Sequence, residues 1–137
     1  MTRVPSERRL LLLLVAVWVL AAALFVVSAV HWPVSVLPRD RGVSDIVFWT
    51  ALTLLVSAFP VVTPRGSVVS VSIAPILASA ILGGPTAAAI VGFVGVTELR
   101  ELRGGIPWYG TLYNHCSTLI AAVLAGATYR TTAQRKR

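Results

Sequence analysis

The sequence predicts an all-α, polytopic integral membrane protein with four to five transmembrane helices, and three observations support this fold class. Of the 137 residues, 56% are hydrophobic and 12% are charged, whereas a soluble domain carries roughly a quarter charged residues. Asp, Glu, Lys and Arg are absent from four segments, 10–38, 46–64, 66–97 and 104–129, and a helix crosses a bilayer with about 20 apolar residues. These segments show almost no polar face at helical or strand period, which a soluble fold requires.

The first apolar segment, 10–30, follows a basic start that contains Arg3, Arg8 and Arg9. A signal peptide begins in the same way, but its apolar region has only about 7–15 residues. This segment is longer, so we expect a retained helix. His31-Trp32-Pro33 ends it, because Trp is typical of the membrane interface and Pro of a helix stop.

The second helix is predicted over 46–62, near the lower length limit for a span. After it, Ser70 and Ser72 alternate with valines at the period of a strand. An isolated strand in lipid would leave its backbone groups unpaired. The sequence therefore favours a short extended stretch near 67–71, followed by a helix.

The third segment is interrupted by Gly83-Gly84-Pro85. Proline breaks the hydrogen bonding of a preceding helix and suits the first turn of a new one. Two interpretations follow: a tight hairpin of helices 68–82 and 85–98, or one kinked span over 73–97. The paired glycines favour the hairpin.

The charge-dense segment Glu98–Gly105 has the pattern of a solvated helix end, and a last helix is expected over 108–129, with a basic tail at 130–137. Together these elements form a single membrane domain, 1–137. Small residues at helical spacing let membrane helices approach closely. The predicted helix-packing positions are Gly83, Gly84, Pro85, Ala88, Gly92, Ala122 and Gly126.

The placement of charge predicts a multi-pass protein of the inner (plasma) membrane with a cytoplasmic N-terminus. Arg and Lys accumulate on the cytoplasmic side, and both the start and the tail of the chain are basic. Two cytoplasmic ends require an even number of spans, which the kinked-span interpretation provides. The hairpin interpretation gives five spans and places one end outside.

The sequence lacks the motifs of common catalytic and metal sites. It contains neither a phosphate-binding loop, nor a nucleophile elbow, nor a His/Cys cluster at metal-ligand spacing. We therefore expect no enzymatic activity, no cofactor and no metal. The net charge of +7 lies at the ends of apolar segments, which indicates anionic lipid as the partner and not nucleic acid. One cysteine, Cys116, permits no intrachain disulfide, and a homo-oligomer is the further assembly to be tested.

His115 is the strongest candidate for a ligand-binding residue. It lies inside the last apolar segment, beside Asn114. An ionisable group within a span is costly and marks a functional site by default. The alternative is a hydrogen bond to a neighbouring helix. With Ser72, these two residues form the predicted ligand site.

Residues 59–129 resemble the N-terminal membrane region of bacterial HD-GYP phosphodiesterases and GGDEF cyclases of cyclic-di-GMP signalling. The matching features are Phe59-Pro60, Arg65-Gly66, the Ser-Val-Ser-Ile of 70–73, Gly84-Pro85, Pro107-Trp108-Tyr109 and Leu112-Tyr113-Asn114. The catalytic motifs of that family are not present, so the resemblance implies a sensory or anchoring module that works through a cytoplasmic signalling partner or a fused output domain. The Gly-Pro break also resembles substrate-binding subunits of energy-coupling vitamin transporters, which implies a small transporter subunit as the alternative.

Overall fold

The computed structural model describes residues 7–34, 42–59, 61–62, 64, 68–69 and 71–135. The described chain is helical apart from short connections and one pair of two-residue strands. The elements in chain order are α1 (Glu7–His31), α2 (Gly42–Ser57), β1 (Val61–Val62), β2 (Val68–Val69), α3 (Ile73–Gly95), α4 (Leu99–Leu102) and α5 (Trp108–Arg135).

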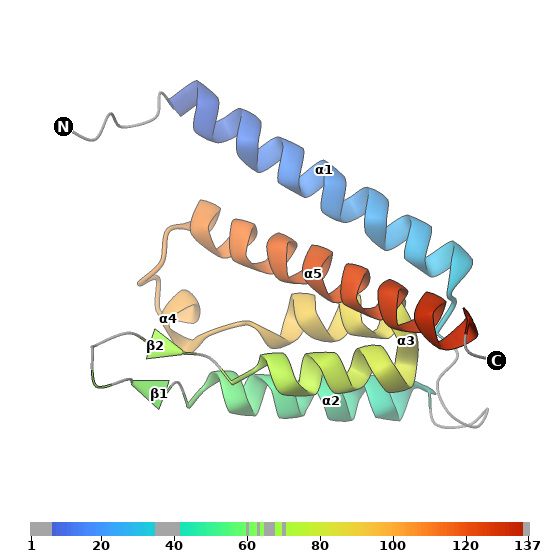
Figure 1. Ribbon diagram of the computed structural model, residues 1–137. Coiled ribbons are helices and arrows are strands. Elements are labelled where there is room, and N and C mark those ends of the chain that lie inside the picture. Colours follow the sequence, from blue (N-terminus) through green and yellow to red (C-terminus); the bar gives the residue numbers. More distant parts are fainter. Residues whose placement is uncertain are drawn as a thin grey trace.

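The long helices lie side by side, with α5 between α1 and the α2–α3 pair (Figure 1). Helix α3 packs against both α5 and α2, whereas α1 packs mainly on α5. Helices α1 and α5 begin at the same end of the molecule and run in the same direction (Figure 1). The start of α1 and the end of α5 therefore lie at opposite ends of the molecule.

Helix α3 is a hairpin of two halves, 73–83 and 85–95. Gly84 has φ 83° and ψ −175°, which no helix contains, and the chain reverses direction within α3 (Figure 1). A Cβ on Gly92 would lie 3.6 Å from Ile76 Cγ2, although these residues would be about 24 Å apart in a continuous helix. The hairpin interpretation is therefore confirmed over the kinked span, and each half is only about 16 Å long.

The predicted helix boundaries differ from the observed ones on both sides of the strand pair. The helix expected over 46–62 ends at Ser57, because Val61 and Val62 pair with Val69 and Val68 as antiparallel strands. The extended stretch expected near 67–71 is present in its described part, β2. Helix α3 consequently begins at Ile73 and not at 68, and its second half ends at Gly95 and not at 98.

The last helix is longer than predicted. The expected end was at residue 129, with a polar tail from 130, but α5 continues to Arg135. Arg130 lies against the α3 turn, and its guanidinium is the neighbour that a Cβ on Gly84 would meet at 2.7 Å. Residues 136–137 of the expected tail lie outside the described residues.

By length and composition, two of the described helices are apolar enough to cross a membrane, α1 and α3, and not the four to five that the sequence led us to expect. Helix α2 is apolar but shorter, with its apolar part over Val43–Ser57. A signal sequence and the core helix of a soluble protein meet the same criteria. The distribution of buried and exposed side chains therefore has to decide how these helices are used.

Candidate functional site

The site forms around His115, which α5 carries two turns after its start at Trp108. Its imidazole lies edge-on to the Phe93 ring, with 5.4 Å between centroids. Its Nδ1 is hydrogen-bonded to the Phe93 carbonyl oxygen. Phe93 lies in the last turn of α3, where backbone carbonyls have no partner within the helix. His115 therefore ties the end of the hairpin to α5.

The second ring nitrogen of His115 contacts a carboxylate. His115 Nε2 lies 3.0 Å from Glu101 Oε2, and the two side chains are only 11% and 4% exposed. The same Oε2 accepts the backbone N–H of Glu98 at 3.3 Å, which fixes the carboxylate at the start of α4. The other oxygen, Glu101 Oε1, is buried and has no partner among the described residues.

An open groove of about 490 Å³ lies over this pair. Apart from Glu101 and His115, its walls are apolar and aromatic, with one hydroxyl. The residues that complete it are Phe93, Ile106, Trp108, Thr111 and Leu112.

The predicted ligand trio does not form one site. Asn114 and Ser72 line a different groove of about 240 Å³, together with Glu98. Consecutive helical residues point about 100° apart, so Asn114 and His115 face different neighbours. The predicted site is therefore divided between two grooves, and the residue that completes the His115 side is Glu101.

Sequence reasoning missed Glu101, because it lies in a charge-dense segment that looked like a solvated helix end. One signal could have found it. A histidine inside an apolar segment needs a partner, and Glu98 and Glu101 are the acidic residues nearest to His115 along the chain.

The predicted packing residues gather where the hairpin turn meets α5. A Cβ on Gly126 would lie 2.9 Å from Pro85 Cα, and one on Gly92 would lie 3.4 Å from Ala122 Cβ. Each of the seven residues is buried, from the turn and the second half of α3 and from α5: Gly83, Gly84, Pro85, Ala88, Gly92, Ala122 and Gly126. Small side chains thus permit the close approach of these helices.

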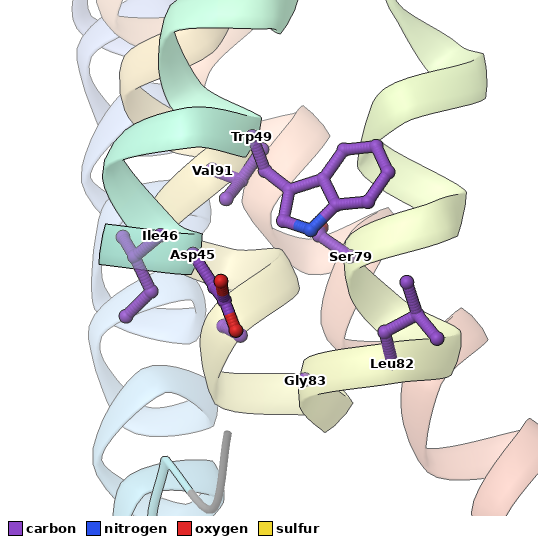
Figure 2. A pocket seen from close by; sticks show the side chains of 8 residues that line it. Asp45, Ile46, Trp49, Ser79, Leu82, Gly83 and Val91 are labelled. Carbon is purple, nitrogen blue, oxygen red and sulfur yellow. The ribbon is translucent and has the colours of Figure 1, made fainter. Parts of the chain in front are cut away.

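A second cavity lies between α2 and the hairpin turn (Figure 2). Asp45 points into it near Gly83, and the Trp49 indole lies beside Ser79 (Figure 2). Its volume of about 20 Å³ is enough for about one water molecule. This space is therefore a packing gap and not a ligand site.

Within the described residues, no group of three or more His, Cys, Asp or Glu side chains could hold a metal ion. What the main site offers is an imidazole and a carboxylate, both largely shielded from solvent, within hydrogen-bond distance of each other. Comparison with known proteins identifies no relative: no family model, no curated protein and no solved structure matches the chain.

Proposed function

We propose that this chain is an integral membrane module that serves a bacterial signalling system as a sensor or an anchor, without catalytic activity of its own. The observation that supports the membrane assignment is that large apolar side chains are exposed while several polar side chains are buried, the reverse of a water-soluble protein. Only three of the 25 residues of α1 are buried, Leu14, Ala21 and Ser28. A helix that is apolar on all sides, yet uncovered by protein, belongs in lipid.

The exposed surface of α1 is built from large apolar side chains. Trp18 is 57% exposed and Val19 is 58% exposed. Water around such a continuous apolar face would cost about 25 cal/mol for each Å², whereas acyl chains cover it without this cost. The exposed large side chains of α1 are Leu10, Leu11, Leu12, Leu13, Val15, Trp18, Val19, Leu20, Val26, Val27 and Val30.

Polar side chains show the opposite behaviour, since several are fully buried. Ser28 and Thr53 are 0% exposed, and their hydroxyls donate to carbonyls of their own helices, Phe25 and Trp49. Ser57 Oγ donates to the Gly95 carbonyl of the neighbouring helix at 2.9 Å. Satisfying polar groups internally is what a hydrocarbon solvent demands.

Helix lengths agree with insertion. Helix α1 has 25 residues and α5 has 28, which corresponds to about 37 and 42 Å and exceeds the hydrocarbon thickness of about 30 Å. The shorter α2 and the two halves of α3 fill the space beside them. In this arrangement α1 crosses the membrane and α3 enters it as a hairpin, and α5, which is long enough to cross but less apolar than α1 and α3, crosses beside them.

The sensory part of the proposal is supported by how α5 connects the two ends of the molecule. It carries His115 near one end and continues without a break to the basic residues Arg130 and Arg135. A change at the His115–Glu101 pair would therefore act on a helix that reaches the opposite side. The resemblance of residues 59–129 to membrane regions of HD-GYP and GGDEF proteins favours a signalling partner as the receiver.

Two measurements test the proposal. Membranes that contain the chain are washed with alkaline carbonate, and we expect the protein to stay in the pellet and to dissolve only in detergent. A photo-crosslinking amino acid at the exposed Ala133 of α5 should then capture one signalling protein. The same crosslinker at Leu12 of α1 should capture only lipid. Carbonate release would refute the membrane assignment, and equal capture from both positions would refute the signalling role.

A transporter subunit is the second candidate, because Ser72, Glu98 and Asn114 line one groove with polar groups. This function requires saturable binding of a small polar molecule that Asn114→Ala weakens. An equilibrium uptake assay in proteoliposomes with pooled water-soluble vitamins separates the candidates. Retention that saturates and depends on Asn114 would replace the signalling proposal.

A further inference from the structure

We propose that His115 and Glu101 together form a proton-binding site, and that the proton held there closes a latch between α3, α4 and α5. The role of this latch as a sensor rests on the proposed function, because the proton would be the signal that the membrane module senses. The latch itself can be tested without any signalling partner.

The hydrogen-bond partners of the His115 imidazole show why a shared proton is needed. A carbonyl oxygen can only accept, so the His115 Nδ1 that is bonded to the Phe93 carbonyl must carry a hydrogen. An imidazole with one hydrogen has that hydrogen on a single nitrogen. If His115 is neutral, its Nε2 therefore has a lone pair and no hydrogen.

Nε2 nevertheless lies 3.0 Å from Glu101 Oε2. A hydrogen bond at this distance needs one proton between the two atoms, either on an imidazolium facing a carboxylate or on a carboxylic acid facing a neutral imidazole. Both forms contain the same number of protons. Without that proton, two lone pairs face each other and the contact becomes repulsive.

The surroundings make the closed state depend on this proton. The Glu101 side chain is 4% exposed and its Oε1 has no partner among the described residues, so a bare carboxylate left at this position would be a buried, poorly compensated charge. Helix α3 carries no titratable side chain, and α1 carries none between Leu10 and Val30. Among the described residues, Cys116 is the one other buried titratable group beside the pair, and its burial favours the uncharged thiol. The remaining charged or titratable groups near this end of the described chain are exposed or line the Ser72 groove: Glu7, Arg8, Arg9, Glu98, Arg100, Arg103, Tyr109 and Tyr113.

The direction of the pH effect follows from counting protons in the closed and open states. Solvated imidazole and carboxyl groups titrate near pH 6.5 and near pH 4.3. Between about pH 4.3 and 6.5 an open, solvated pair also holds the proton, so closure does not depend on pH. Above about pH 6.5 the open pair has released it, and closure must take up one proton. The closed-to-open ratio then falls about tenfold for each pH unit.

Opening would separate three elements at once. Phe93 lies in the last turn of the hairpin, Glu101 in α4 and His115 in α5. Loss of the shared proton therefore frees the start of α5 from the hairpin and from the connecting segment. The segment 97–106 is the part of the chain in which opening should be visible first.

The experiment is hydrogen–deuterium exchange of segment 97–106, measured by mass spectrometry on the full chain in lipid nanodiscs from pH 5 to 8.5. Rates are corrected for the intrinsic pH dependence of amide exchange. We expect protection to be constant up to about pH 6.5 and then to fall about tenfold per unit. Glu101→Gln provides the decisive comparison, because its amide nitrogen can donate to a neutral imidazole without a shared proton. The amide nitrogen cannot accept the long 3.3 Å bond from the Glu98 N–H, so protection should be lower than in the wild type at pH 5 but should not fall as pH rises. Glu98→Gln, the matched control, should follow the wild type.

A second readout observes the proton itself. In a His31→Gln background, ¹⁵N spectra of the remaining imidazole should show a protonated Nδ1 throughout and a change at Nε2 that coincides with the loss of protection. Protection with the same pH profile in wild type and Glu101→Gln would overturn the latch, as would a ring with no hydrogen on Nδ1. Neither result would affect carbonate resistance or partner capture, so failure of the latch and failure of the membrane module remain distinguishable.

Discussion

The turn of the α3 hairpin depends on one glycine, and Gly84→Ala should destabilise the protein by a predictable amount. Gly84 has φ 83° and ψ −175°, a backbone conformation that is essentially restricted to glycine and costs other residues of order 1–3 kcal/mol. A loss of this size lowers the folded-to-unfolded ratio by roughly 5- to 150-fold, since 1.4 kcal/mol is a factor of ten.

A second contribution at Gly84 is separable from the first. The new Cβ would lie 2.7 Å from Arg130 Nη2, which is the far end of a flexible side chain and can move away. The backbone strain at residue 84 cannot be relieved by the movement of a side chain. The double variant Gly84→Ala with Arg130→Ala should therefore recover little of the lost stability.

The free energy of unfolding can be measured by titration with dodecyl sulfate in mixed micelles, followed by circular dichroism. Gly104→Ala is the matched control, because Gly104 also has a positive φ of 70° but nothing within 4 Å of a Cβ and a position in the α4–α5 connection. Gly104→Ala should lower the free energy of unfolding by about 1–2 kcal/mol at most and should leave the contacts between the helices unchanged. Wild-type stability of Gly84→Ala, or full recovery on removal of the Arg130 side chain, would refute the argument from backbone strain.

Two further substitutions probe the contact between α2 and α3. Ser57→Ala removes the hydroxyl that donates to the Gly95 carbonyl and should cost about 1 kcal/mol, whereas Ser117→Ala should have no measurable effect, because that exposed hydroxyl bonds only within its own helix. Equal stabilities of these two variants in the same titration would contradict a role for the interhelical bond. Gly95→Ala places a Cβ 2.6 Å from the Thr53 side chain and should cost about 1–3 kcal/mol through overpacking, while Gly110→Ala, whose Cβ would lie 3.2 Å from Ile106 Cγ2, should cost less. A stable Gly95→Ala variant would show that α2 can move away from α3.

The features that the sequence predicted correctly are those set by local chemistry. The break at Gly83-Gly84-Pro85 follows from what glycine and proline allow the backbone to do, and the hairpin forms there. The end of α2 was predicted wrongly, because Val61 and Val62 continue the apolar run of the helix. Their pairing with β2 is a contact between separate parts of the chain that no local pattern contains.

The candidate site shows the same division. His115 could be selected from the sequence, because an ionisable residue within an apolar segment is unusual wherever the chain folds. Glu101 could not, since its burial depends on how the segment after α3 turns back toward α5. Asn114 was grouped with His115 because the two are neighbours in sequence, but adjacent helical positions face different grooves.

The proposed orientation of the chain in a membrane depends on the directions in which α1 and α5 run. Helices α1 and α5 run in parallel (Figure 1), so in the proposed membrane arrangement the two basic ends lie on opposite sides, as the hairpin interpretation predicted and the kinked-span interpretation did not. The start of α1 and the α3–α5 connection lie at one end, and the end of α1, the start of α2 and the end of α5 lie at the other (Figure 1). By sequence, six of the twelve Lys and Arg residues lie in the chain up to the first turn of α1, in the α2–α3 connection and in the α3–α5 connection, and the other six lie in the α1–α2 connection and from residue 130 onward.

Because the difference in Lys and Arg between the two sides sets orientation, an even division predicts insertion in both directions. Alkaline phosphatase and green fluorescent protein, each fused after α5, should then both be active. Arg100→Gln with Arg103→Gln should favour the orientation with the end of α5 in the cytoplasm, and Arg39→Gln with Arg41→Gln the reverse. Reporters placed before α1 should always give the opposite side. If the two ends of the chain are found on the same side, the parallel arrangement of α1 and α5 is incompatible with the membrane, and the insertion proposed for this fold is refuted.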